Sequence, residues 1–150
     1  MADEQQKELR QILMIRRLRL QRAESRVVQA QGAEKRAIEE VARKEKDALR
    51  AASENAERES ELALGLFNHK THLSHIEKFR RDVGELRKHT ASAREEVEVA
   101  KKTRVEAKTA VREAAELQRS AYRAVEKLEF VLQEIKDEQA IVADRRSPDE

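Results

Sequence analysis

The chain has no cysteine, no tryptophan, one proline and three glycines among its 150 residues. Without cysteine it can form no disulfide, no thiolate nucleophile and no thiolate metal site. One proline and three glycines are too few for the many turns that a compact domain of this length needs. Aromatic residues make up only 3% of the chain, so we expect no large globular core. The apolar surface must instead form a narrow stripe.

Long apolar runs are also missing. Because a membrane-spanning helix needs about 20 consecutive apolar residues, we expect no transmembrane segment. The opening residues, MADEQQKE, are polar and acidic, so we expect no secretory signal. The lack of cysteine fits a reducing compartment.

Charged residues are abundant, at 41% of the chain, but they nearly balance to a net charge of +2. Such a total does not indicate a nucleic-acid-binding protein, since only a local basic patch could do so. Alanine, glutamate, lysine, arginine and leucine dominate, which is typical of coiled coils and long helices.

An apolar repeat of seven residues runs through the second half of the chain. Such a repeat places a stripe on one side of a helix, which must be buried against another helix in a left-handed supercoil. One row of this seam is Leu86, Ala93, Ala100, Ala107, Ala114, Ala121, Leu128, Ile135 and Val142. The companion row is Ile76, Val83, Thr90, Val97, Arg104, Val111, Gln118, Val125 and Leu132.

The first half carries a less pure seam with the same period. One row is Leu13, Leu20, Val27, Glu34, Val41, Ala48, Asn55 and Leu62. The other row is Arg16, Ala23, Ala30, Ala37, Lys44, Ala51, Arg58 and Gly65. The two seams predict an all-α fold in which two long antiparallel helices form a coiled-coil hairpin.

The break between the halves predicts the turn. Gly65 and Asn68 are residues that commonly end helices, and Ser74 followed by Glu77 resembles a capping box that starts one. We therefore expect one domain, with a first helix over about 5–65, a turn over 66–74, a second helix over about 75–143 and a frayed tail over 144–150.

Pairing across this turn brings large residues opposite small ones when partner numbers sum to 141. Leu20 then meets Ala121 and Val41 meets Ala100, while Leu13 meets Leu128 and Leu62 meets Phe79. Net charges of opposite sign also face each other near both ends of the hairpin, which helps to set the register. We therefore expect a monomer in which the helices pair within one chain.

Three histidines, His69, His72 and His75, suggest a metal site at first sight. At about 100° per residue, however, they do not share one helix face, and no carboxylate or thiol lies among them. We therefore expect no metal site and no cofactor, and read them as polar residues at an exposed tip. Leu66, Phe67 and Leu73 at the same tip either close the end of the seam or contact a partner.

The densest basic cluster lies near the start of the chain, mixed with apolar residues. It contains Arg16, Arg17, Arg19, Arg22 and Arg26. Three interpretations stay open: a membrane-surface helix, a nucleic-acid contact, or a protein contact or solvated face. We favour the last, because no aromatic residues interleave the bases. The chain has no glycine-rich phosphate loop, nucleophile elbow or Cys–His set, so we expect no enzyme.

The segment Met14–Glu24, MIRRLRLQRAE, resembles the start of the YscO-type proteins of bacterial type III secretion. Those proteins are short, cysteine-poor, charged helical hairpins that look like the flagellar protein FliJ. Both are similar to the coiled-coil part of the central stalk of rotary ATP synthases. In this chain thirteen residues precede Met14, which implies either an extended helix or a start at Met14.

The resemblance implies a non-catalytic cytoplasmic stalk that links the hexameric secretion ATPase to the export gate, with escort of secretion chaperones as a further role. It implies ATPase contacts at the end carrying both termini, by Arg16, Arg17, Arg19, Arg22, Phe130 and Ile141. It implies export-gate contacts at the opposite tip, by Leu66, Phe67, His69, His72 and Leu73. The alternatives are a generic coiled-coil scaffold or homodimer, and a stator-type ATPase regulator.

Overall fold

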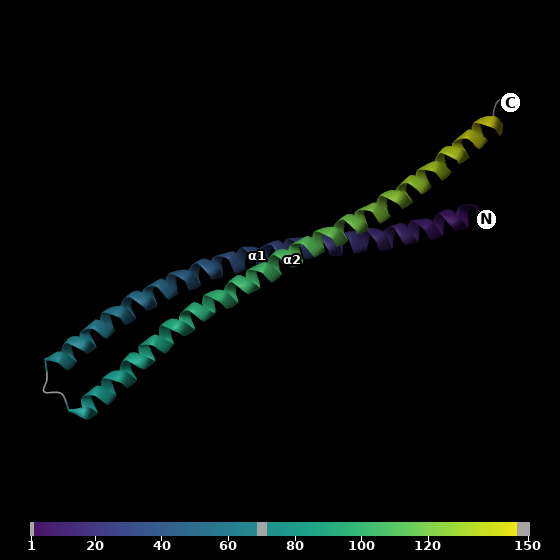
Figure 1. Ribbon diagram of the computed structural model, residues 1–150. Coiled ribbons are helices and arrows are strands. Elements are labelled where there is room, and N and C mark those ends of the chain that lie inside the picture. Colours follow the sequence, from purple (N-terminus) through teal and green to yellow (C-terminus); the bar gives the residue numbers. More distant parts are fainter. Residues whose placement is uncertain (1, 69–71, 147–150) are drawn as a thin grey trace. The chain divides into compact units, whose positions relative to one another are not determined.

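The computed structural model describes residues 2–68 and 72–146, and nearly all of them are helical. Helix α1 spans Ala2–Phe67 and helix α2 spans Leu73–Arg146, with 66 and 74 residues. The helices pack against each other as a helical hairpin, and no strand occurs in these ranges (Figure 1). The predicted all-α fold class is confirmed.

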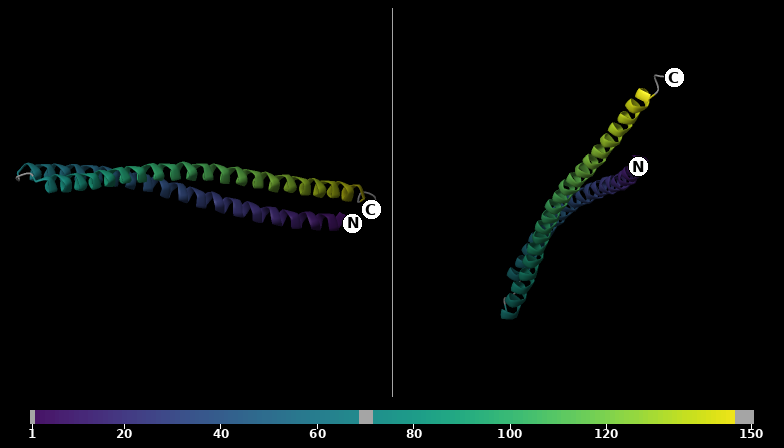
Figure 2. Two further views of the ribbon diagram at one scale, coloured as in Figure 1. Left: turned by 60° about the horizontal axis from the view of Figure 1, so that its bottom comes forward. Right: turned by 90° about the vertical axis from the view of Figure 1, so that its right-hand side faces the viewer.

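Each helix is continuous along its whole length, as the further views show (Figure 2). The sequence explains this, because the only proline lies at position 148 and good helix formers fill the rest. Gly65 and Gly84 lie inside the helices, and no described residue has a positive φ. The sequence had suggested that Gly65 ends the first helix, but α1 continues past it.

The connection between the helices is shorter than the expected turn over 66–74. Helix α1 continues to Phe67, and the amide of Asn68 still donates to the Leu64 carbonyl oxygen at 3.1 Å. The carbonyl oxygen of His72 accepts the first bonds of α2, from the amides of His75 (2.9 Å) and Ile76 (3.3 Å). His72 therefore occupies the cap position.

Ser74 accordingly lies inside α2, and the predicted capping box of Ser74 and Glu77 is wrong. Asp144, Arg145 and Arg146, which we expected to fray, are helical. His69 and the rest of the connection over 69–71 lie outside the described residues, as does the tail over 147–150.

The hairpin divides into two compact units, each of which contains part of both helices. Unit 1 consists of residues 1–32 and 109–150, and unit 2 consists of residues 33–108.

In unit 1 a buried apolar cluster joins the first turns of α1 to the last third of α2. Leu13 packs there with Val125, Leu128 and Leu132, as the expected pairing of Leu13 with Leu128 requires. Leu9 and Leu20 pack against this cluster and are partly buried. A hydrogen bond of 3.0 Å from Gln6 Nε2 to Gln139 Oε1 extends the pairing toward the chain ends.

In unit 2 polar contacts between the helices follow the same antiparallel register. Arg87 Nη2 lies 2.8 Å from Glu59 Oε1, and Lys44 Nζ lies 3.0 Å from Glu96 Oε2. Their numbers sum to 146 and 140, close to the predicted sum of 141. The register inferred from large-to-small pairing is thus found in the contacts.

The buried apolar residues follow the predicted seam closely. Every one that the structure describes occupies a seam position: Leu13, Ala23, Ala37, Val41, Ala51, Val83, Val97, Ala100, Val125, Leu128 and Leu132. Several of them are alanines, whose small side chains let two helices approach closely. The seam fails at four positions that are exposed, namely Arg58, Gly65, Arg104 and Val142.

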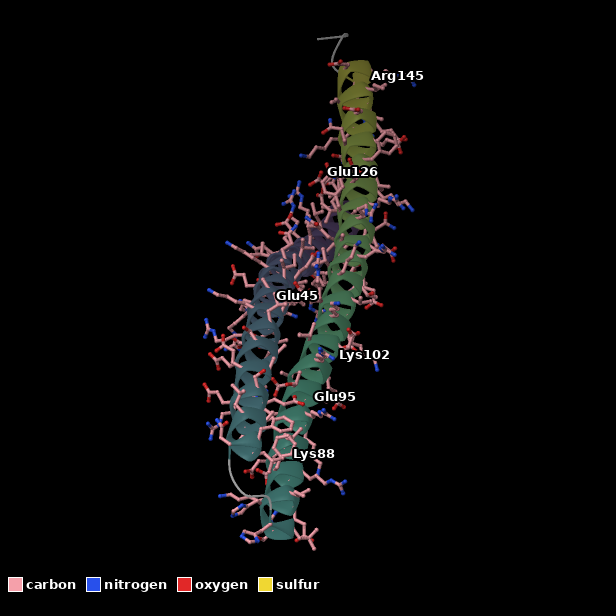
Figure 3. The ribbon with its side chains drawn as sticks, turned by 60° about the vertical axis from the view of Figure 1, so that its left-hand side comes forward. Glu45, Lys88, Glu95, Lys102, Glu126 and Arg145 are labelled. Atoms are coloured by element: carbon pink, nitrogen blue, oxygen red, sulfur yellow. The ribbon has the colours of Figure 1, made fainter. Side chains whose placement is uncertain are left out.

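Charged side chains cover the outside of the helices, for example at Glu45, Lys102 and Glu126 (Figure 3). Within the described ranges, neither helix contains a stretch that is apolar and long enough to cross a membrane.

Candidate partner-binding surfaces

The predicted ATPase-contact arginines fall into two groups. Arg16 is half-buried, and its Nη1 donates to the carbonyl oxygen of Ala124 at 2.9 Å. Arg17 Nη2 lies 3.0 Å from Glu129 Oε1 on α2. These two side chains join α1 to α2, so both guanidinium groups already have a hydrogen-bond partner within unit 1.

Arg19 and Arg22 differ from this pair. Both are exposed, and within the described residues neither forms a hydrogen bond or an ion pair. Arg26 is exposed and unpaired in the same way. A guanidinium that has no internal carboxylate is available to an acidic partner, since its fork matches a carboxylate.

Large apolar side chains are exposed beside these arginines on α1. Met14 is 65% exposed, and Ile12, Ile15 and Leu18 are between 41% and 51% exposed. They cannot join the seam, because α2 covers only one side of the helix. Exposed apolar residues that gather in one place indicate an interaction surface more strongly than single ones do.

On α2 the predicted contact residues Phe130 and Ile141 are both exposed. Phe130 lies two residues after the buried Leu128, so its ring points away from the seam. Tyr122 and Val131 are exposed as well, and the sequence reasoning did not single them out. Their signal was present, because both interrupt the polar outer positions of this helix.

The tip of unit 2 presents a second exposed apolar group. Phe67 is 83% exposed and Leu73 is 72% exposed, whereas Leu66 is half-buried. Phe79 is also half-buried and lines one hollow together with Leu62, the partner expected for it. Phe79 thus closes the seam, while Phe67 and Leu73 project from it.

Histidines at the tip contact each other. The rings of His72 and His75 are edge-to-face, with centroids 5.7 Å apart. In the part of the chain that the structure describes, no group of three potential ligands from His, Cys, Asp and Glu forms a metal-binding arrangement. The third predicted member, His69, lies outside that part.

A polar layer interrupts the seam of unit 2 at Asn55. Its Nδ2 lies 2.8 Å from Thr90 Oγ1, 3.1 Å from His89 Nδ1 and 3.3 Å from the Leu86 carbonyl oxygen. Thr90 donates in turn to the Leu86 carbonyl oxygen at 3.1 Å. A polar residue inside a seam specifies register at some cost in stability, and this layer has the contacts to do so.

We therefore predict a trade between stability and specificity at Asn55. Replacing it as Asn55→Leu should raise the free energy of unfolding by about 1 kcal/mol, because an apolar seam residue replaces a polar one. The same change should let chains pair with each other, seen as a dimer fraction in light scattering. Ser53→Leu, at an exposed position of the same helix, should do neither. A destabilised Asn55→Leu monomer would contradict this interpretation.

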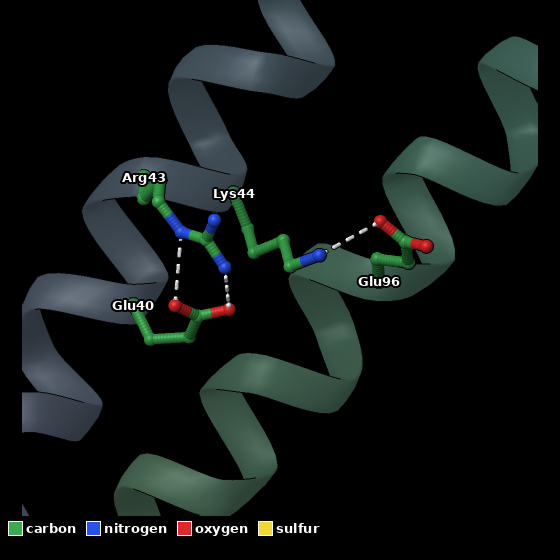
Figure 4. Close-up of polar contacts among 4 residues, drawn as sticks. All are labelled: Glu40, Arg43, Lys44 and Glu96. Carbon is green, nitrogen blue, oxygen red and sulfur yellow. Dashed lines mark hydrogen bonds and ion pairs between the residues drawn. The ribbon is translucent and has the colours of Figure 1, made fainter.

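Unit 2 also contains a charged layer, formed by Glu40, Arg43 and Lys44 of α1 and Glu96 of α2 (Figure 4). Arg43 forms a two-pronged contact with Glu40, with Nε to Oε2 at 3.0 Å and Nη2 to Oε1 at 2.6 Å. The hydrogen bond from Arg43 lowers the pKa of Glu40, and the same bond raises the pKa of Arg43. Lys44 occupies a seam position, and its amine reaches Glu96 on α2. A carboxyl that stays ionised in such a fork suits a structural contact and not proton transfer.

Comparison with models of known protein families, with curated proteins and with solved structures found no significant match.

Proposed function

We propose that this chain is a non-catalytic stalk of a type III secretion system. In this proposal it works in the cytoplasm and links the hexameric secretion ATPase to the export gate. The sequence of Met14–Glu24 resembles YscO-type stalk proteins, and the helical hairpin is the fold that such a stalk requires. Escort of secretion chaperones is a further role that the resemblance suggests.

The observation that carries this proposal is the surface formed within that segment. Met14, Ile15 and Leu18 are at least half exposed, and the unpaired Arg19 and Arg22 lie among them. Large apolar side chains together with arginine are enriched at protein interfaces. This composition supports a protein contact at the family-like segment. Phe130 and Ile141 on α2 offer further apolar area in the same unit.

The proposed coupling needs no chemistry from the stalk. A ring of six ATPase subunits offers six copies of one site, and the two different helices of this hairpin would contact those copies unequally. A ligand shifts an equilibrium only by its difference in affinity for the two states. Unequal contacts of this kind would favour different nucleotide states in different subunits.

Contact with the export gate is proposed for the tip of unit 2. Phe67 and Leu73 carry this part, because both are largely exposed apolar residues next to the connection between the helices. Leu66 and His72 belong to the same region, with Leu66 half-buried and His72 exposed.

The proposal predicts a loss of ATPase stimulation when the apolar surface is removed. In the triple variant Met14→Ser, Ile15→Ser and Leu18→Ser, stimulation of the purified secretion ATPase from the same organism should fall at least about tenfold, since each interface anchor typically contributes more than 1 kcal/mol. All three side chains are exposed, so circular dichroism should show the helicity of the parent chain.

The matched control removes three exposed apolar residues elsewhere, Val28→Ser, Leu49→Ser and Val99→Ser, and should stimulate as the parent chain does. Equal activity of the two triple variants would favour the generic coiled-coil scaffold, the other function that a helical hairpin supports. Stimulation by a dimeric chain bound outside the ring would favour the stator-type regulator.

A further inference from the structure

The hairpin of unit 1 has two flanks, one on each side of the seam. The first flank is marked by the ion pair of Arg17 and Glu129 at 3.0 Å. Each of these residues directly follows a seam residue, Arg16 in α1 and Leu128 in α2. The first flank therefore consists of the residues that directly follow the second seam residue of each heptad. On this flank, such residues of α1 face such residues of α2.

The second flank, on the other side, consists of residues that directly precede the first seam residue of each heptad. Because residues seven apart share one stripe of a coiled coil, the second flank can be read from the sequence. On α1 it comprises Ile12, Arg19 and Arg26, and on α2 it comprises Leu117, Ala124 and Val131.

The register places these residues at matching levels. The contacts of Gln6 with Gln139 and of Arg16 with the carbonyl oxygen of Ala124 bracket the position of Ile12. Ile12 therefore lies at the level of Val131. Because the helices run in opposite directions, Arg26 lies further along the flank, at the level of Leu117.

The second flank carries three large apolar residues, and no ion pair connects the two helices across it. Ile12 and Val131 are about equally exposed, at 41% and 40%, and Leu117 is 54% exposed. A two-helix seam leaves such residues partly covered, so a third helix could bury them. No ion pair between α1 and α2 lies on this flank within the described residues.

Unpaired cations border this apolar base. Arg19 and Arg26 lie on the flank, while Arg22 and Lys127 lie on the adjoining stripe of each helix, next to Ile15 on α1. All four cations are exposed, and within the described part of the chain none has an acidic partner. Glutamates on the same stripes lie just beyond the two ends of this segment, with Glu113 past the level of Arg26 and Glu8, Glu134 and Glu138 past the level of Ile12.

We propose that the second flank of unit 1 is the docking groove for an acidic amphipathic helix of a partner protein. The apolar stripe of that helix would pack on Ile12, Leu117 and Val131 and complete a three-helix bundle. Its glutamates or aspartates would lie on either side of the stripe. There they would reach Arg19, Arg22, Arg26 and Lys127.

Charge complementarity selects this occupant. Arginine binds a carboxylate with two parallel hydrogen bonds, and opposite charges beside a coiled-coil seam set partner choice and orientation. A helix with a basic border would be repelled by four cations, which is how an interface rejects wrong partners. The groove shares Arg19 and Arg22 with the surface of the stalk proposal, but its test uses the isolated chain and measures no ATPase activity, so either proposal can fail without the other.

The probe for the test is a synthetic helix of three heptads, with leucine and isoleucine at the seam positions, glutamate at the flanking positions and a fluorescein label. A matched peptide carries lysine in place of each glutamate. In fluorescence anisotropy the glutamate peptide should bind the full chain saturably and at least about tenfold more tightly than the lysine peptide. Equal binding of the two peptides, or no binding, would overturn the proposal.

Two pairs of variants locate the binding site. Val131→Glu and Arg22→Glu should each weaken binding of the glutamate peptide at least about tenfold. The matched controls Val28→Glu and Arg10→Glu change exposed residues of the same types in unit 1, away from the second flank, and should leave binding unchanged. Since Arg22 is fully outside the seam, its variant tests the groove even if Val131→Glu unfolds the hairpin.

Two other occupants give distinct results. If a second copy of the chain occupies the groove, light scattering should show a dimer that Val131→Glu abolishes. If the groove lies on a membrane, vesicles containing anionic lipids should bind the parent chain and lose binding in Arg22→Glu. Either result, without preferential binding of the glutamate peptide, would overturn the assignment to a partner helix.

Discussion

The variant Leu128→Ala should lower the free energy of unfolding by about 3 kcal/mol, because it removes buried methyl groups and leaves a cavity. Leu128 is 6% exposed and lies in the cluster of Leu13, Val125 and Leu132. This cluster joins α1 to α2 in unit 1, so its loss should weaken the contact between the helices there. Urea unfolding followed by circular dichroism measures the effect.

A matched control exists on the same helix and in the same unit. Leu117 is 54% exposed, so Leu117→Ala removes the same atoms from a largely solvated site. We expect a change within about 0.5 kcal/mol there, as for most surface substitutions. If the two variants were equally stable, the buried cluster at Leu128 would not hold the helices together.

The variant Val97→Asp should destabilise unit 2 by about 3 kcal/mol or more at pH 7, because it places a carboxylate without a partner inside the seam. Val97 is 8% exposed, whereas Val99, two residues further along α2, is 60% exposed. Val99→Asp should therefore change stability little. Urea unfolding of the two variants compares the same chemical change at a buried and at an exposed position.

The pH dependence of the two aspartate variants should differ as well. Burial raises the pKa of the carboxyl introduced by Val97→Asp, so the folded state holds its proton at a pH where the unfolded chain has lost it. The penalty should shrink as the pH falls toward the unfolded pKa of about 3.9 and grow as the pH rises above it. A penalty that is independent of pH, or equal for both positions, would show that position 97 is not buried in solution.

The sequence predicted the heptad seam well because the seam is a local property. A residue's place on a helix depends only on its number along that helix, so a period of seven identified buried positions such as Val41 and Val125. The same periodicity could not foresee the exposure of Arg58 and Arg104. A long charged side chain can leave the seam for water, and the period says nothing about this choice.

The turn was predicted less well than the seam. Gly65 and Ser74 both carried helix-boundary signals, yet both lie inside helices, and the cap is at His72. Such signals have a weak energetic preference, of about 1 kcal/mol for a cap. At the tip the half-buried Leu62, Leu66 and Phe79 line one hollow, and burial of side chains this large can outweigh such a preference.

The sequence by itself determined that this chain forms two long helices, where the chain reverses to within a few residues, and which side of each helix is buried. These properties follow from composition and from periods that act along one helix. Only the tertiary structure decided which arginines of the basic cluster have a hydrogen-bond or ion-pair partner on the other helix. Arg16 and Arg17 reach Ala124 and Glu129 across the hairpin, whereas Arg22 finds no acid. That difference depends on which atoms of α2, more than a hundred residues away, come within hydrogen-bond distance of each side chain.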